Sequence, residues 1–273
     1  MKDLRADALE IFKSGLKAVE AGQAVRCALR RSGSNLTFES IDHLSSIDIS
    51  EFDRVFLVGG GKASGAMAEA FIAAIGPENI SGGAISIPAD ASVPDLPLCI
   101  DIFEATHPLP SEGAVVGAKR MIEIADAATE KDLIVFLLSG GASAILPLPA
   151  DGITLDDKVE TTKLLLACGA RIDEINAIRK HISAIKGGQF VKAAYPAKVI
   201  SLIISDVIGH RLESIGSGPT VRDTTTFADC LGIARKYRLL NKLPKSVLKH
   251  LKDGALGKFA GPEDIPESVF ERC

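Results

Sequence analysis

Three consecutive glycines and a lysine, Gly59, Gly60, Gly61 and Lys62, stand directly after the apolar residues 55–58. Glycines let the backbone approach an anion closely, and a helix that begins after them offers unpaired N–H groups with a partial positive charge. The Lys62 ammonium adds a full charge suited to a phosphoryl oxygen. The stretch predicts phosphate binding, and the alternative is a tight strand-to-helix turn with a solvated lysine.

This stretch matches neither of two common nucleotide-binding motifs. In a Walker A loop the first glycine would fall on Phe56, and Ala63 stands where the magnesium-binding serine or threonine belongs. A dinucleotide fingerprint would need a third glycine at Ser64. The prediction therefore depends on the glycine backbone and on the charge of Lys62.

A second loop of small residues, "SGGAS", follows another apolar run. Ser139, Gly140, Gly141 and Ser143 offer backbone and hydroxyl donors without net charge, which suits a nucleotide phosphate or a substrate carboxylate. The loop does not complete the G-x-S-x-G elbow of a serine nucleophile. A binding role is thus favoured over a hydrolase.

The segment "DEINAIRKHISAIKGGQF", residues 173–190, combines an apolar and a polar face if it forms one helix. Asn176, Lys180, Ser183 and Gly187 would share the polar face. The side chains able to bind the carboxylate and phosphate groups of a small acid are Glu174, Asn176, Arg179, Lys180 and Lys186. The alternative is an ordinary solvated helix face.

Two further residues stand just after apolar runs. His107 lies in "ATHPLP", where prolines fix the backbone and hold the imidazole in a crevice, or where it is a hydrogen-bonded structural histidine. Asp206 lies in "SDVIGH" after the last strong run and suits a metal ion or a base for a hydroxyl. Its alternative is a turn or helix-capping aspartate.

The elements that must position these residues alternate along the chain. Apolar runs at 54–58, 83–87, 98–103, 133–138 and 198–204 predict buried strands, and periodic segments at 64–75, 111–128, 156–169 and 173–195 predict helices. The first 30 residues predict an amphipathic helix that packs on the sheet. The pattern indicates an α/β fold with a mainly parallel sheet, whose strand ends converge on one shared site.

Composition excludes several classes of protein. The 273 residues are 47% hydrophobic with a formal charge of −4, which predicts a globular protein that binds no nucleic acid. No apolar run reaches the length of a membrane helix, and the charged N-terminus is unlike a signal peptide, so we expect a cytoplasmic protein without a membrane partner. The five cysteines are scattered, and neither disulfides nor zinc is indicated.

Six ordered motifs together resemble the class II glycerate 2-kinases, the glycerate kinase family with a C-terminal MOFRL domain. They are "VGGGKASGAMAEA", "ATHPLPSEGAVVGAKRM", "FLLSGGASAIL", "IDEINAIRKHISAIKGGQ", "SDVIGH" and "GSGPTVRDTTTFADCL". The resemblance spans about residues 3–270. It implies a Rossmann-like, three-layer α/β/α domain over residues 1–251, with residues 252–273 leading toward a smaller C-terminal domain.

The resemblance also implies an activity, the ATP- and Mg²⁺-dependent phosphorylation of D-glycerate to 2-phosphoglycerate. Lys62 and Asp206 would be catalytic, with Asp206 organising the metal or accepting the hydroxyl proton. Phosphate would contact Gly59, Gly60, Gly61, Gly140, Gly141 and Ser143. Substrate would contact Asn176, Arg179, Lys180, Ser139, His107 and Glu174.

Two departures from the family pattern bear on this expectation. His210 stands where the family usually has a second aspartate, which weakens a two-carboxylate magnesium site. The MOFRL domain, which closes the cleft, is not in the sequence, so we expect low activity unless a complementing C-terminal domain or a homodimer partner completes the site. The alternatives are a hydroxypyruvate reductase and a noncatalytic binding or assembly protein with the same fold.

Overall fold

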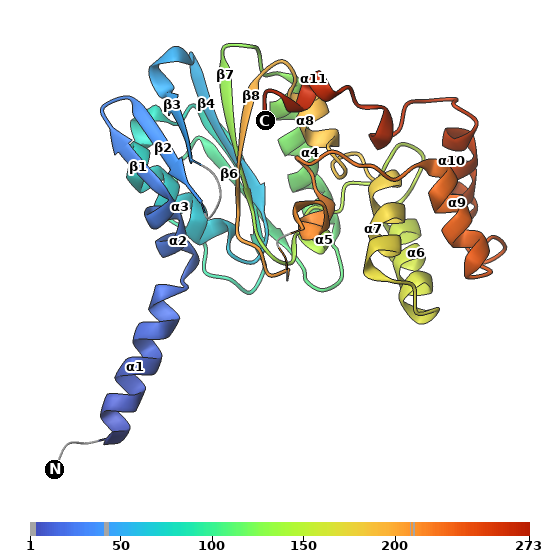
Figure 1. Ribbon diagram of the computed structural model, residues 1–273, viewed down its shortest axis with the longest axis horizontal. Coiled ribbons are helices and arrows are strands. Elements are labelled where there is room, and N and C mark those ends of the chain that lie inside the picture. The colour runs from blue at the N-terminus through green and yellow to red at the C-terminus, as the bar shows by residue number, and fades with distance from the viewer. Residues whose placement is uncertain (1–3, 41–43, 208, 210) are drawn as a thin grey trace.

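The computed structural model describes residues 4–40, 44–207, 209 and 211–273. Its centre is a parallel sheet of five strands in the order β6-β5-β4-β7-β8 (Figure 1). The strands are β4 (Arg54–Gly60), β5 (Gly82–Pro88), β6 (Ile100–Ala105), β7 (Asp132–Leu138) and β8 (Lys198–Ile203). Each predicted strand is present, and the α/β class is confirmed.

Helices cover both faces of this sheet, which explains why its strands are apolar runs without alternation. On one face α2 (Ala21–Ala28) and α3 (Ser64–Ile75) pack over Leu57 and Leu133. On the other face α4 (Glu112–Asp126) and α8 (Gln189–Ala194) pack over Phe136, whose ring centroid lies 4.6 Å from that of Phe190. The arrangement has the three layers that the sequence predicts.

A group of helices stands beside the sheet with a core of its own (Figure 1). These helices are α6 (Leu155–Ala167), α7 (Ile172–His181), α9 (Phe227–Lys236) and α10 (Lys245–Ala255). Short helical turns connect the parts, namely α5 (Ala142–Ile145), η1 (Ile49–Glu51), η2 (Pro77–Asn79), η3 (Leu212–Ser217), η4 (Pro262–Asp264) and α11 (Glu267–Phe270). The last of these turns pack back on the chain, because Ile265 and Val269 contact Val191 of α8.

The N-terminal expectation was only partly right, because the first 30 residues contain two helices, of which α2 packs on the sheet and α1 (Leu4–Ala18) does not. The amphipathic segment forms α1, which runs away from the rest of the molecule and buries no residue (Figure 1). The periodicity predicted the helix and its apolar side, but it cannot say what covers that side. A three-stranded antiparallel sheet that we did not predict follows α2, formed by β1 (Leu29–Ser32), β2 (Asn35–Glu39) and β3 (Leu44–Asp48).

The predicted helix over 173–195 is two helices. α7 ends at His181, and the chain then runs irregularly through residues 182–188, where Ser183 bridges to Pro149. Gly187 and Gly188 have φ angles of +61° and +82°, which a continuing α-helix cannot contain. The polar residues of this segment therefore do not share a single helix face.

Candidate functional site

The two glycine-containing loops lie side by side at the carboxyl end of the sheet. The Lys62 N–H donates to the Gly140 carbonyl at 2.8 Å, and the Ala63 N–H donates to the Ser139 hydroxyl at 3.0 Å. The loops follow β4 and β7, which are neighbours, and the chain builds the sheet outward in opposite directions from this pair. Such a reversal point is where ligands bind in open α/β sheets.

Lys62 and His107 meet at Gly141. A Cβ atom added to Gly141 would lie 3.0 Å from Lys62 Cγ and 3.3 Å from His107 Cδ2. Gly141 has a φ of +84°, which strongly favours glycine. Lys62 is exposed, and its ammonium makes no hydrogen bond or ion pair with a residue that the structure describes. A full positive charge thus stands free beside the two loops.

Asp206 adds a carboxylate on the other side of the same loop. A Cβ atom at Gly140 would lie 2.3 Å from Asp206 Oδ2, so the glycine leaves room for this carboxylate. Asp206 is exposed and has no partner among the described residues. His210, the residue that replaces a second aspartate, lies outside the described residues.

The side chains around the two loops suit magnesium that is shared between one carboxylate and a substrate phosphate better than magnesium held by protein ligands alone. No group of three or more His, Cys, Asp and Glu side chains is placed to hold a metal within the described ranges. Mg²⁺ is commonly held by one or two carboxylates together with substrate phosphates rather than by a cage of protein ligands. The Asp206 carboxylate, beside Gly140 of the second glycine-containing loop, fits that arrangement.

The remaining loop residues differ in what they can offer. Gly59 and Gly60 are the last residues of β4, buried and paired with both β5 and β7, so they precede the loop itself. Ser143 lies in the short α5 and is partly exposed. The part of the two loops that lies beyond the strands therefore begins at Gly61 and includes the residues from Ser139 to Ser143. The phosphate-binding role of each glycine stays a prediction.

Three predicted substrate ligands have partners within the fold. The Lys180 ammonium donates to Asp223 Oδ1 at 2.8 Å, and both side chains are buried. Glu174 accepts from Lys236 at 2.6 Å and from Tyr237, and these bonds lower its pKa to about 2. The Asn176 amide oxygen accepts from the Ser217 hydroxyl at 3.2 Å, which ties α7 to η3.

Arg179 differs from its neighbours because it has no hydrogen-bond or ion-pair partner in the described part of the chain. It lies close enough to Lys158 and Lys186 to repel both of their charges. Lys186 was named from the sequence, but Lys158 was missed. Its signal was present, because Lys158, Thr161 and Leu165 form the buried side of α6, and a lysine on such a stripe is unusual.

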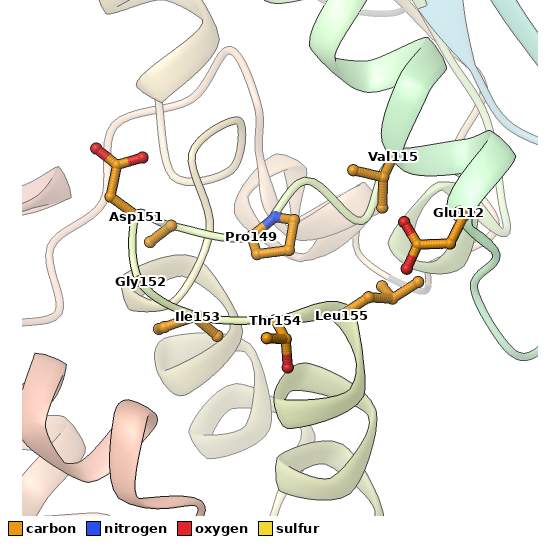
Figure 2. Close-up of a pocket in the computed structure, with 9 residues that line it drawn as sticks. Glu112, Val115, Pro149, Asp151, Gly152, Ile153, Thr154 and Leu155 are labelled. Atoms are coloured by element: carbon orange, nitrogen blue, oxygen red, sulfur yellow. The ribbon is translucent and has the colours of Figure 1, made fainter.

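A separate pocket of about 420 Å³ lies between the start of α4 and the loop 149–155 (Figure 2). Glu112 and Asp151 are its charged lining residues, and none of its lining side chains is basic. A phosphate or carboxylate would meet only negative charge there. The two glycine-containing loops are the better anion site.

No helix in the described part of the chain is both long enough and apolar enough to cross a membrane.

The strand order defines a doubly wound α/β protein with two glycine-containing loops at its reversal point. A family model described as a domain of unknown function, DUF4147, matches residues 7–252, and the chain belongs to this family. Its relatives include a glycerate 2-kinase of Pyrococcus horikoshii, which is 36% identical over 97% of this chain and 58% of that protein. Another relative, in Agrobacterium vitis and provisionally named a hydroxypyruvate reductase, is 42% identical over 74% of this chain and 45% of that protein.

A crystal structure of a Pyrococcus horikoshii protein superposes with a TM-score of 0.84 at 36% identity, over 97% of this chain and 59% of that one. The chain thus spans about half the length of these relatives, from 45% to 59%. The resemblance to glycerate 2-kinases that the sequence motifs indicated is confirmed.

Proposed function

We propose that this chain is the phosphate- and acid-binding part of a glycerate 2-kinase, which transfers the γ-phosphoryl group of ATP to the 2-hydroxyl of D-glycerate. The observation that carries the proposal is that Lys62 and Asp206, which have no partner among the described residues, meet two hydrogen-bonded small-residue loops at the sheet reversal point. The name of the Pyrococcus relative supports the choice of substrate.

In this reaction the 2-hydroxyl oxygen forms a bond to the γ-phosphorus while the bond from that phosphorus to the β,γ-bridging oxygen breaks. Negative charge is spread over the transferring group, so catalysis depends on positioning and on nearby positive charge. We assign that charge to Lys62. Asp206 either accepts the hydroxyl proton or holds Mg²⁺ together with phosphate oxygens, and Mg²⁺ would supply further charge neutralisation when bound.

The acid would lie next to Lys62 and Asp206, where the phosphoryl group is transferred. We propose Arg179, His107 and Ser139 as its direct contacts. Arg179 has no partner in the described part of the chain, His107 lies beside Gly141, and Ser139 begins the loop that contacts Ala63. Lys180, Asn176 and Glu174 are engaged within the fold, so we propose that they position α7 around the acid.

The rest of the enzyme would come from a C-terminal domain or from a second copy of the chain. We keep the predicted boundary near residue 251 as part of this proposal and move it to the end of α10 at Ala255, because a boundary after residue 251 would cut that helix. The turns after residue 261 pack on α8 through Ile265 and Val269. Glu263 also ties them to α9 and α7, because it accepts from the backbone N–H of Phe227 at 3.0 Å and lies 3.1 Å from His181 Nε2. A following domain would therefore start from an anchored end.

The proposal is tested by incubating the 273-residue chain with ATP, Mg²⁺ and D-glycerate, alone and with a separately produced C-terminal half of a relative. We expect ADP release that depends on D-glycerate, and much faster release with the added half because it excludes water and positions the nucleotide. A folded chain that releases no ADP in either mixture would refute the kinase and favour a binding or assembly protein.

The name of the Agrobacterium relative favours a second candidate, a hydroxypyruvate reductase. The same preparations are therefore mixed with hydroxypyruvate and NADH or NADPH. Oxidation of the nicotinamide at a rate above that of ADP release would favour the reductase. We expect no oxidation, because the stretch after β4 lacks the third glycine of a dinucleotide fingerprint.

Replacing Gly141 by alanine is expected to lower kcat/KM for D-glycerate at least tenfold. The new Cβ would press on Lys62 and His107, and the positive φ would add about 1–2 kcal/mol of strain. Gly152→Ala is the matched control, since Gly152 has a φ of +77° but no atom within 4 Å of its added Cβ. Urea unfolding should show similar losses for both variants, with activity lost only in Gly141→Ala. Equal activities would mean that Gly141 does not shape the site.

A further inference from the structure

Three cationic side chains from two helices and a loop come together next to the proposed acid site. Lys158 lies on α6 and is 7% exposed, Lys186 lies in the loop 182–188 and is 1% exposed, and Arg179 on α7 is half-buried. The Leu148 carbonyl that accepts from Lys158 also accepts from the Ser183 hydroxyl, three residues before Lys186. The charge of Arg179 opposes the charged forms of both lysines. This group is called the cationic cluster below.

The cationic cluster has no counterion. No carboxylate forms an ion pair with any of its members within the residues described by the structure. The Lys158 ammonium donates to the Leu148 carbonyl at 3.1 Å and the Lys186 ammonium to the Gly216 carbonyl at 2.8 Å, while Arg179 has no partner among the residues that the structure places. Buried charges in proteins are normally paired or neutralised, so an uncompensated group of three is costly.

The neighbouring residue Lys180 provides an internal comparison. Its ammonium is also buried, and the fold gives it the Asp223 carboxylate at 2.8 Å. The same helix therefore carries one cation that is neutralised by the protein and another, Arg179, that is not. Among the described residues, the lack of a carboxylate partner is therefore specific to the cationic cluster and does not extend to the adjacent Lys180.

Burial has the expected effect on the three groups. It lowers the pKa of Lys186 to about 7, with help from the charge of Arg179, and lowers the pKa of Lys158 well below its usual value. Burial also lowers the pKa of Arg179. An anion bound among them would stabilise the charged forms and relieve the mutual repulsion.

We propose that Lys158, Arg179 and Lys186 form a binding site for one small oxyanion, either a carboxylate or a phosphate group. The two ammonium groups supply point charges, and the guanidinium supplies a planar pair of donors that matches two oxygens of either group. The site adds Lys158 and Lys186 to the contact that the proposed function gives to Arg179. Binding can be measured whether or not the chain transfers phosphate.

Contacts connect the cationic cluster to the phosphate-facing loops. Lys186 holds the Gly216 carbonyl, and a Cβ atom on Gly216 would lie 3.0 Å from the Cβ of Ala142, the residue next to Gly141. The oxyanion site thus borders the edge of the sheet where Lys62 and the Ser139–Ser143 loop lie. An acid held there by its carboxylate would be adjacent to Lys62 and to the Ser139–Ser143 loop.

The test measures binding of inorganic phosphate, D-glycerate and the uncharged glycerol to the 273-residue chain by isothermal titration calorimetry at low ionic strength. We expect phosphate, D-glycerate or both to bind and glycerol not to bind. Competition between phosphate and D-glycerate would show that one site takes both groups, whereas binding of one alone would identify it as a phosphate or a carboxylate site.

Variants assign the binding to the cluster. Lys186→Met and Arg179→Gln should each weaken anion binding about tenfold or more, as expected for the loss of a charged hydrogen bond. Lys163→Met, an exposed lysine on the same helix as Lys158, should bind like the wild type. Arg179→Gln keeps the test usable if Lys186→Met fails to fold, because Arg179 is only half-buried.

Thermal unfolding without anions separates a binding role from a structural one. Lys186→Met should unfold at a higher temperature than the wild type, because it removes a buried charge that has no counterion. The proposal is wrong if the wild-type chain binds neither anion, or if Lys186→Met and Arg179→Gln bind anions as tightly as the wild type. A lower unfolding temperature of Lys186→Met with unchanged anion affinity would show a purely structural lysine.

Discussion

Lys62→Ala is expected to abolish D-glycerate-dependent ADP release while the chain remains folded. Lys62 belongs to one glycine-containing loop and lies beside Gly141 of the other, so its removal takes away the positive charge that we assign to the transferring phosphoryl group. A single cation placed on this group is worth about 10³-fold or more in rate in other phosphoryl-transfer enzymes. The measurement is the turnover rate of the chain together with the C-terminal half of a relative.

Two controls accompany this variant. Lys119→Ala removes an exposed lysine from α4 and should keep the wild-type rate. Circular dichroism and urea unfolding should be unchanged in Lys62→Ala, because the side chain is exposed and has no partner among the described residues. Normal turnover by Lys62→Ala would refute the role assigned to this lysine.

Lys180→Met is expected to lower the free energy of unfolding by about 3–5 kcal/mol, the largest effect on stability that we predict. The Lys180–Asp223 pair is buried at both ends, and removal of the ammonium leaves the Asp223 carboxylate buried without its main partner. In this variant Asp223 Oδ1 would keep its hydrogen bonds from the backbone N–H and the hydroxyl of Thr225. Asp223 Oδ2 accepts no hydrogen bond from a described residue even in the wild type.

The matched control for Lys180→Met is a lysine that is not buried. Lys192→Met removes an exposed lysine from α8 and should change the unfolding free energy by less than about 0.5 kcal/mol. Urea unfolding measures both variants. If Lys180→Met is as stable as Lys192→Met but binds D-glycerate poorly, Lys180 is a direct substrate ligand and not the positioning residue proposed above.

The parts of the fold that the sequence predicts well are those determined by local composition. The strands β4 to β8 are buried on both sides, so they stand out as apolar runs between polar loops. The small strands β1 to β3 escaped notice because residues such as Arg30, Arg31 and Ser45 make them polar and partly exposed. The break after His181 escaped as well, because it depends on pairing with a distant residue, Pro149.

The candidate site likewise combines residues with a local sequence signal and residues that only tertiary packing brings together. Lys62 and the Ser139–Ser143 loop could be predicted to meet, because each follows a parallel strand and such strand ends lie at one edge. The partner of Lys180 is 43 residues away in a loop, and no local pattern identifies Asp223 as that partner. Lys158 joins Arg179 only through the packing of α6 beside α7, so the cationic cluster required the structure.

The central claim is phosphoryl transfer from ATP to the 2-hydroxyl of D-glycerate, and phosphorus-31 NMR of the reaction mixture tests it most directly. The mixture contains the 273-residue chain, the C-terminal half of a relative, ATP, Mg²⁺ and D-glycerate. We predict that the γ-phosphate signal of ATP falls as the signal of 2-phosphoglycerate rises in equal amount, and that Lys62→Ala prevents both changes. Release of inorganic phosphate alone, formation of 3-phosphoglycerate, or unchanged ATP in the presence of the folded wild-type pair would contradict the account.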